Sequence, residues 1–251
     1  MAGRRRRWTR WLIGAVAVIV VLVVGGPFVY IHFIEGKAPA PLSLSTETST
    51  TAAGRTAGAA QGASSSTSEA TATATSSTSV DGTWKTGTGS LAGYRIKETL
   101  FGQSNTAVGR TSAITGSITI SGTEVSAGQF TVDMTKVKSD ESERDDQFQG
   151  RIMDTARFPT STFVLTQPIQ LGSIPAEGTT ITQTATGELT LHGTTRTVTF
   201  PVQARLNGTT ISVSGSIPIV FADYGIDNPS GGPATTSNNG ILEFLLNFSR
   251  S

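Results

Sequence analysis

The sequence of 251 residues contains no cysteine and only two histidines, and these scarcities exclude several kinds of chemistry. Without cysteine there can be no disulfide, thiolate nucleophile, cysteine metal ligand or lipid-modified cysteine. His192 is the one histidine after residue 80 and stands in an expected turn, so neither a zinc site nor a Ser-His triad is indicated. We therefore expect no catalytic residue, no metal and no cofactor, and a binding protein instead of an enzyme.

Basic charge is scarce in the part of the chain that can fold. Seven basic and three acidic side chains give residues 1–80 a net charge of +4, so the formal total of +1 leaves −3 for residues 81–251. Duplex binding depends on a basic surface that neutralises phosphates. A nucleic-acid partner is therefore not expected.

Large apolar side chains are nearly absent from residues 38–79, where only Leu42 and Leu44 occur among many Ser, Thr, Ala and Gly residues. Such a composition cannot bury enough apolar surface to offset the entropy of ordering the chain. We expect residues 35–80 to form a disordered linker with an r.m.s. reach of roughly 40 Å. Residues 81–251 are then the folded domain.

Residues 11–34 form the one long hydrophobic run. Its first part, 11–31, is uncharged and has the length of about 20 residues that a helix needs to cross a bilayer. Five arginines lie within the basic segment 1–10, which the positive-inside rule places in the cytoplasm. We expect a single-pass anchor in the plasma membrane, with the C-terminal domain extracytoplasmic. A cleaved signal peptide ending near Ala38-Pro39-Ala40 is the alternative, although the run is long for one and Pro41 would hinder cleavage.

From Ile114 onward apolar and polar residues alternate, which is the period of β-strands with one buried face. Turn sequences separate the alternating segments near Gly122, at His192-Gly193 and at Asn207-Gly208, the last being typical of a type I′ turn. About eight strands connected in this way favour an antiparallel sheet that closes into a barrel. A β-sandwich is compatible with the same pattern.

Residues 139–158 interrupt the alternation and predict one short helix, capped by Ser139 or Asp140. Phe148 and Ile152 lie four residues apart and would share its buried face. We expect this segment to cover one end of the barrel as a plug or lid.

Three segments, residues 139–163, 187–196 and 221–226, resemble the YceI-like family. Arg144-Asp145 and residues 157–163 are similar to the family's Arg-Asp pair and Pro-x-x-x-Phe strand entry, and residues 187–196 resemble its G-x-L-T-x-x-G-x-T-[KR] hairpin. Residues 221–226 resemble its late Asp-aromatic-Gly turn, although the common Asn-Arg before this Asp is absent. The similarity extends over nearly all of residues 90–249. It implies an extended lipocalin-like barrel that binds polyisoprenoids or other amphiphilic chains and catalyses no reaction.

Candidate contacts for such a ligand are the apolar residues at alternate strand positions, which are expected to face the interior of the barrel. An apolar chain needs continuous apolar contact to offset its lost freedom, so it would touch the barrel wall if the interior is hollow. A packed interior without a cavity is the alternative. Arg144 is the candidate contact for a headgroup, since a guanidinium suits a pyrophosphate, whereas a surface ion pair is the alternative reading. The candidate wall residues are Phe130, Phe163, Leu165, Leu191, Phe200, Ile217, Ile219 and Phe244.

These patterns favour a membrane-anchored extracytoplasmic binding protein that serves as a carrier or reservoir for a long-chain amphiphile. Its expected partners are the lipid ligand and the plasma membrane. The alternative function is an interaction or structural domain of the cell envelope, in which a filled barrel binds a protein partner.

Overall fold

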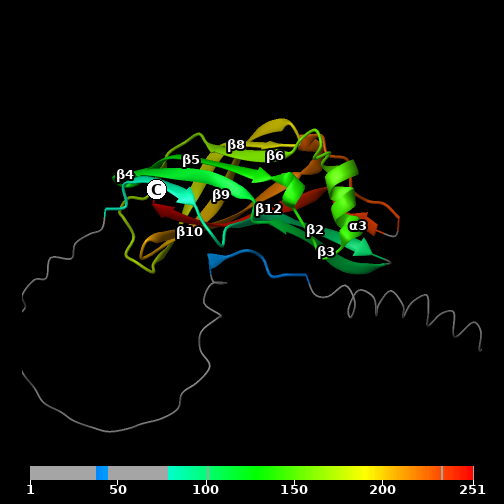
Figure 1. The fold of residues 1–251 in the computed structure, drawn as a ribbon, viewed down its shortest axis with the longest axis horizontal. Coiled ribbons are helices and arrows are strands. Elements are labelled where there is room, and N and C mark those ends of the chain that lie inside the picture. Colours follow the sequence, from blue (N-terminus) through cyan, green and yellow to red (C-terminus); the bar gives the residue numbers. More distant parts are fainter. Residues whose placement is uncertain (1–37, 45–78, 101, 233, 251) are drawn as a thin grey trace, which may run out of the picture.

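The computed structural model of the protein describes residues 38–44, 79–100, 102–232 and 234–250. The basic segment 1–10 and the hydrophobic run 11–34, expected to span a membrane, lie outside these ranges. Among the helices of the described residues, none has both the length and the apolar character that crossing a bilayer requires. Figure 1 shows that the folded domain is built almost wholly from strands.

The strands alternate with tight turns, and one helical segment interrupts them between β5 and β6. The strands are β1 (Gly82–Thr86), β2 (Leu91–Leu100), β3 (Gln103–Thr111), β4 (Ile114–Ser121), β5 (Glu124–Asp133), β6 (Thr160–Leu165), β7 (Ile169–Gln170), β8 (Thr180–Leu191), β9 (Thr194–Asn207), β10 (Thr210–Val220), β11 (Ala234–Thr236) and β12 (Asn239–Arg250). The helical elements are η4 (Met134–Lys136), α3 (Ser142–Gln147), η5 (Phe148–Ile152) and η6 (Phe221–Tyr224).

Eight strands close into a ring in the order β1-β4-β5-β6-β8-β9-β10-β12, because β12 pairs with β1 as well as with β10. All of these pairings are antiparallel. The predicted antiparallel barrel is therefore confirmed, and the closed ring rules out the β-sandwich. β2 follows β1 along the same edge of β12, and β3 and β11 flank β2 and extend the sheet beyond the ring.

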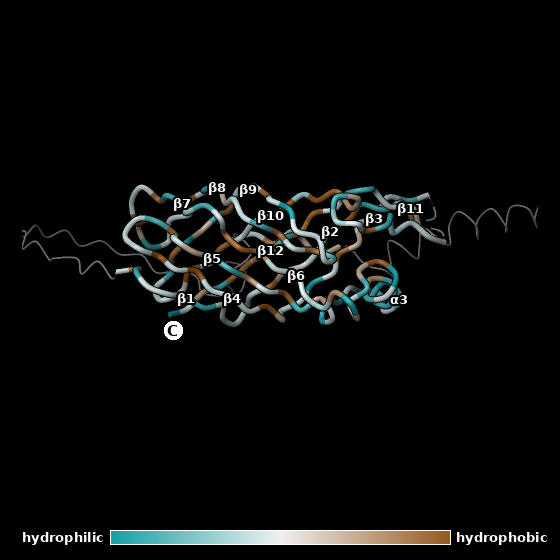
Figure 2. Tube along the Cα trace, turned by 90° about the horizontal axis from the view of Figure 1, so that it is seen from above, coloured by the Kyte–Doolittle hydropathy of each residue, from teal (hydrophilic) through white to brown (hydrophobic). Residues whose placement is uncertain are grey.

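The two ends of the barrel differ (Figures 1 and 2). One end, here called the helix end, carries α3, the β2–β3 hairpin, the β8–β9 turn and β11. The opposite end, here called the terminal end, carries the β4–β5 turn, the β9–β10 turn and the C-terminus. The helical segment therefore lies across one opening of the barrel, as the sequence predicts.

The helical segment buries the face that the sequence predicts, but its N-cap is a different residue from the predicted ones. Phe148 is buried and stacks on Tyr94 with ring centroids 5.0 Å apart, and Ile152 packs against the same core. The capping prediction is wrong, because Glu141 is the N-cap and makes no side-chain cap hydrogen bond. Ser139 instead donates from its backbone N and its hydroxyl to Asp145 Oδ1, at 2.7 and 2.8 Å. The carboxylate of Asp145 is buried and accepts both hydrogen bonds, because a buried charge requires polar partners.

The two predicted hairpins are present, with one difference in turn geometry. His192 and Gly193 have φ of 51° and 75°, the two left-handed residues of a type I′ turn. In the β9–β10 hairpin Asn207 still pairs with Thr210, so Gly208 and Thr209 form the loop. Only Gly208 of these two has positive φ, because a β-branched threonine disfavours it. The type I′ prediction for Asn207-Gly208 is therefore wrong.

Residues 38–44 lie on the outer surface of the barrel, where Figure 1 draws them as a separate blue segment. Leu44 is buried, and the Pro39 carbonyl accepts a hydrogen bond of 2.6 Å from Arg95 Nη2. In this short stretch the chain contacts the domain and differs from the free coil expected for the linker. Residues 45–78 lie outside the described ranges.

Candidate ligand cavity

The interior of the barrel is hollow. Inward-facing side chains enclose a cavity of about 1130 Å³, somewhat above the range of roughly 300–1,000 Å³ that is typical of small-molecule pockets. Its wall runs from Phe148 at the helix end to Phe248 toward the terminal end. A packed interior, the alternative left open by the sequence, is not what the structure contains.

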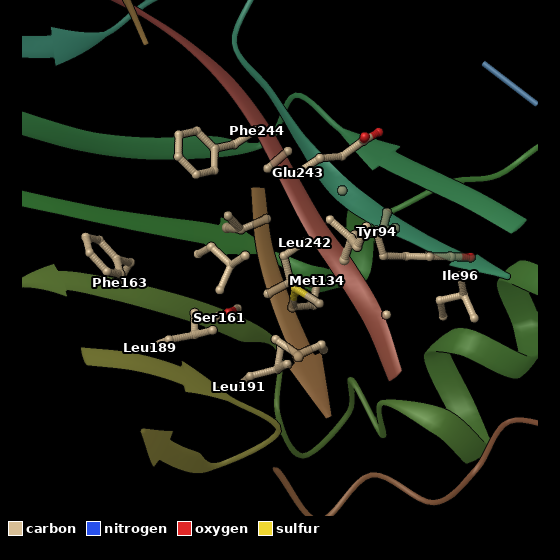
Figure 3. Close-up of a pocket in the computed structure, with 18 of the residues that line it drawn as sticks. Tyr94, Ile96, Met134, Ser161, Phe163, Leu189, Leu191, Leu242, Glu243 and Phe244 are labelled. Atoms are coloured by element: carbon tan, nitrogen blue, oxygen red, sulfur yellow. The ribbon is translucent and has the colours of Figure 1, made fainter. Parts of the chain in front are cut away.

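All eight apolar candidates lie in the cavity wall, on β5, β6, β8, β9, β10 and β12. Figure 3 shows Phe163, Leu191 and Phe244 around one common space, together with Leu189 and Leu242. Alternation places them correctly because side chains two apart on a strand point to the same face. Their contact with a ligand stays a prediction.

Large aromatic rings line this cavity without filling it, because each packs against a glycine on the neighbouring strand. The pairs are Tyr94–Gly109, Phe130–Gly116, Phe163–Gly187 and Phe244–Gly215, and an added Cβ would lie 2.4, 2.7, 2.5 and 2.6 Å, respectively, from a ring carbon. Each ring thus occupies the volume that a side chain on the facing strand would otherwise take. The rings stay at the wall, and the centre of the barrel stays open.

Three of these rings, Phe130, Phe163 and Phe244, form a continuous line of contacts around the wall together with Phe200. Phe163 lies between Phe130 and Phe200 at centroid distances of 6.2 and 5.4 Å, and Phe200 contacts Phe244 at 6.0 Å. Beyond them, toward the terminal end, Trp84 and the fully buried Phe248 belong to a second packed core cluster. The cavity therefore ends in packed apolar side chains on this side.

The helix end of the cavity is polar. Glu98 faces inward from β2, accepts a hydrogen bond of 2.9 Å from Asn105 Nδ2 and lies 3.4 Å from Arg144 Nη2. Arg144 also pairs with Asp140, one helical turn earlier. The structure thus places Arg144 at the rim of the cavity, but with its guanidinium engaged by two carboxylates. A headgroup contact for Arg144 stays a prediction.

Sequence reasoning missed the contribution of β2 to the wall. Tyr94 and Ile96 line the cavity beside Leu242, and Glu98 follows them on the same face. These residues alternate with the charged Arg95 and Lys97, and this alternation indicated a strand with one face toward the interior. Met134, in η4 directly after β5, also lines the cavity, and its alternation with Phe130 and Val132 indicated this inward position.

The buried phenol of Tyr94 makes the free energy of unfolding depend on pH in the alkaline range. Burial raises the pKa of Tyr94 above its ordinary value near 10, Arg144 opposes this, and the carboxylates of Asp145 and Glu98 add to it. The folded chain thus keeps this proton where the unfolded chain loses it. The stabilisation is complete below about pH 10 and is lost as the pH rises above it.

We expect the free energy of unfolding in urea to fall between about pH 9 and 11.5 in the wild type, and to fall less in Tyr94→Phe. Part of the fall should persist, because burial also raises the pKa of Tyr224. Identical pH dependence of the two proteins would contradict the assignment to Tyr94.

Comparison with known proteins agrees with this architecture. The family model described as "YceI-like domain" matches residues 63–248. No curated protein is significantly similar to the chain. A polyisoprenoid binding domain from Saccharophagus degradans, implicated in plant cell wall breakdown, is 17% identical with a TM-score of 0.54, covering 67% of this chain and 98% of that one. BcnA from Burkholderia cenocepacia is 22% identical with a TM-score of 0.50, covering 63% and 95%. At these identities the two structures support the fold.

Proposed function

This chain belongs to the YceI-like domain family, and on that premise we propose that its barrel binds one amphiphile with a long hydrocarbon chain, of the polyisoprenoid class. The observation that carries the proposal is the apolar cavity of about 1130 Å³, which the ring–glycine pairs keep open. The domain from Saccharophagus degradans, described as polyisoprenoid binding, supports the same ligand class. The proposed role is that of a carrier or reservoir, and it involves binding alone.

The energetics place most of the affinity in the hydrocarbon tail. Burial contributes about 0.8 kcal/mol per methylene, so ten buried methylenes supply about 8 kcal/mol before the loss of freedom is counted. A hydrogen bond between the head and a charged side chain at the rim contributes about 1.5–3 kcal/mol. The tail is therefore proposed to fill the apolar wall region, with the head near Arg144 at the helix end.

The proposed location is outside the plasma membrane. Residues 11–34 would span the bilayer with the N-terminus in the cytoplasm, which the five arginines before the uncharged run support. The alternative role, a display domain built on a filled barrel, is weakened by the hollow interior.

The proposal is tested by native mass spectrometry of the full chain purified from the cells that produce it and released from detergent in the gas phase. We expect a second species, heavier by one ligand of defined mass, whose extract contains a long-chain amphiphile. Finding the bare polypeptide mass alone, at every detergent concentration tried, would overturn the proposal.

A further inference from the structure

Several side chains on the outer face of the barrel are as buried as the core. In β10, β12 and β3 they occupy the positions between the inward-facing residues, where a solvated face would expose them. Figure 3 shows one of them, Glu243, directed away from Leu242 and Phe244. The set is Val108, Ser212, Ser214, Glu243 and Leu245, with exposed fractions between 1% and 6%. This part of the outer surface is therefore covered.

Residues 38–44, here called the strap, lie on this face and are held through their backbone. Barrel side chains contact at least four of the strap residues. The contacts are Arg95 Nη2 to the Pro39 carbonyl at 2.6 Å, Arg110 Nη2 to the Ala40 carbonyl, Glu243 Oε2 to the Leu42 N–H at 3.4 Å, and Arg205 Nη2 to the Leu44 carbonyl at 2.9 Å. Contacts spread along the whole strap fix its position and its direction.

Glu243 is the centre of the contact. Its carboxylate lies 2.7 Å from Arg110 Nη2 and 3.3 Å from Arg95 Nε, while only 3% of its side chain is exposed. Gly93 stands between Glu243 and Arg110 in the strand register, and a Cβ there would lie 2.9 Å from Arg110 Cγ. The missing side chain thus lets Arg110 reach across β2. Two guanidiniums on one carboxylate leave a net positive charge, which the carbonyls of the strap face.

The composition of the strap suits this role. Pro39 and Pro41 restrict φ and have no N–H, so the strap loses less conformational freedom on docking and leaves fewer donors unpaired. Leu42 and Leu44 are the only large apolar residues in 38–79, and Leu44 is 2% exposed. These two leucines stand out from the small and polar residues of the linker. They form the apolar part of a docking segment.

The direction of the strap relates it to the cavity. Pro39 is held by Arg95, in the middle of β2 and five residues before its end at Leu100 at the helix end. Leu44 is held by Arg205, two residues before the end of β9 at the terminal end. The strap therefore enters from the side of the polar rim of the cavity (Figure 1).

We propose that the strap holds the barrel with its helix end, and so the polar rim of the cavity, toward the lipid surface. This rests on the proposed function and on residues 11–34 spanning the bilayer. Residues 35–37 alone would then separate membrane and strap, a path of at most roughly 14 Å. The length of residues 45–78, which follow the strap in the sequence, then does not set the distance between barrel and membrane. A hydrocarbon tail could then pass between bilayer and cavity with little exposure to water.

Docking is tested by hydrogen exchange of the full chain, read in peptides that cover residues 38–44. We expect the Leu42 amide, whose N–H donates to Glu243, to exchange at least tenfold faster in Leu44→Ser than in the wild type. Ala40→Ser is the matched control, because the Ala40 side chain is exposed and only its backbone carbonyl contacts Arg110, and it should change exchange much less. Fast exchange of the Leu42 amide already in the wild type would overturn docking.

Orientation is tested by energy transfer, which the absence of native cysteine makes simple. A single dye is placed on Thr235→Cys at the helix end or on Thr123→Cys at the terminal end, both exposed. The full chain is reconstituted in phosphatidylcholine vesicles that contain a headgroup-labelled acceptor lipid. We expect several-fold more transfer from position 235 than from position 123, and loss of this difference in Leu44→Ser.

Equal transfer from the two positions, or a chain that does not float with the vesicles, would overturn the orientation. These readouts do not require a ligand in the cavity. A bare mass in the spectrometric experiment would therefore overturn the proposed function, while protection of the strap and unequal transfer would still support the proposed orientation.

Discussion

Replacing Gly128 with phenylalanine should lower the fraction of protein that retains its hydrocarbon ligand at least tenfold. Gly128 faces the cavity from β5, and an added Cβ would meet Ile118 and Leu165 at an ordinary contact distance of 3.6 Å. The strand can therefore accept a side chain here, and its ring must extend into the space proposed for the tail. Each displaced methylene costs about 0.8 kcal/mol, so two displaced methylenes exceed the 1.4 kcal/mol of a tenfold change.

The matched control for this variant is Ala127→Phe. Ala127 precedes Gly128 and is exposed on the outer face of the same strand. We expect its ligand content, measured as the ratio of liganded to bare protein in native mass spectra, to equal that of the wild type. Circular dichroism should show the same strand content in both variants. Undiminished ligand in a folded Gly128→Phe protein would mean that the tail does not occupy this cavity.

Gly215→Ala should lower the free energy of unfolding by about 1–3 kcal/mol, the usual cost of overpacking. The new methyl would lie 2.6 Å from Cζ of Phe244, so the ring must leave the wall and move toward the centre of the barrel. In the double variant Gly215→Ala/Phe244→Leu the smaller side chain removes the clash. We therefore expect much of the lost stability to return, with a coupling energy of about 0.5–3 kcal/mol in the double-mutant cycle.

Gly128→Ala is the control for replacing a glycine with alanine without a steric clash, because its methyl would meet neighbouring atoms at 3.6 Å. It should be neutral or slightly stabilising, since alanine has fewer conformations in the unfolded chain. Urea unfolding is measured for five proteins, namely the wild type, Gly215→Ala, Phe244→Leu, the double variant and Gly128→Ala. If Gly215→Ala were as stable as Gly128→Ala, the close packing of Phe244 on Gly215 would not be what holds the ring at the wall.

Much of the fold can be read from the sequence, because strand alternation and turn chemistry are local properties. Inward parity alone places Phe130, Phe200 and Phe244 on the wall, and the turn at His192-Gly193 follows from its residues. The helix cap could not be predicted in this way. It depends on Asp145, six residues beyond Ser139, returning to bond it once the segment is buried.

The sequence by itself determined consecutive strands joined by short turns and the side chains that share their buried face, since both follow from local turn chemistry and a two-residue period. Closure into a barrel rather than a sandwich was decided by the pairing of β12 with β1. Only the tertiary structure decided that the interior is hollow, because this depends on which glycine meets which ring across strands, as Gly116 meets Phe130. It also decided that Arg144 is paired with Glu98 and that Leu44 is held by Arg205, 46 and 161 residues apart. Such contacts arise from the register and closure of the sheet, which no local pattern encodes.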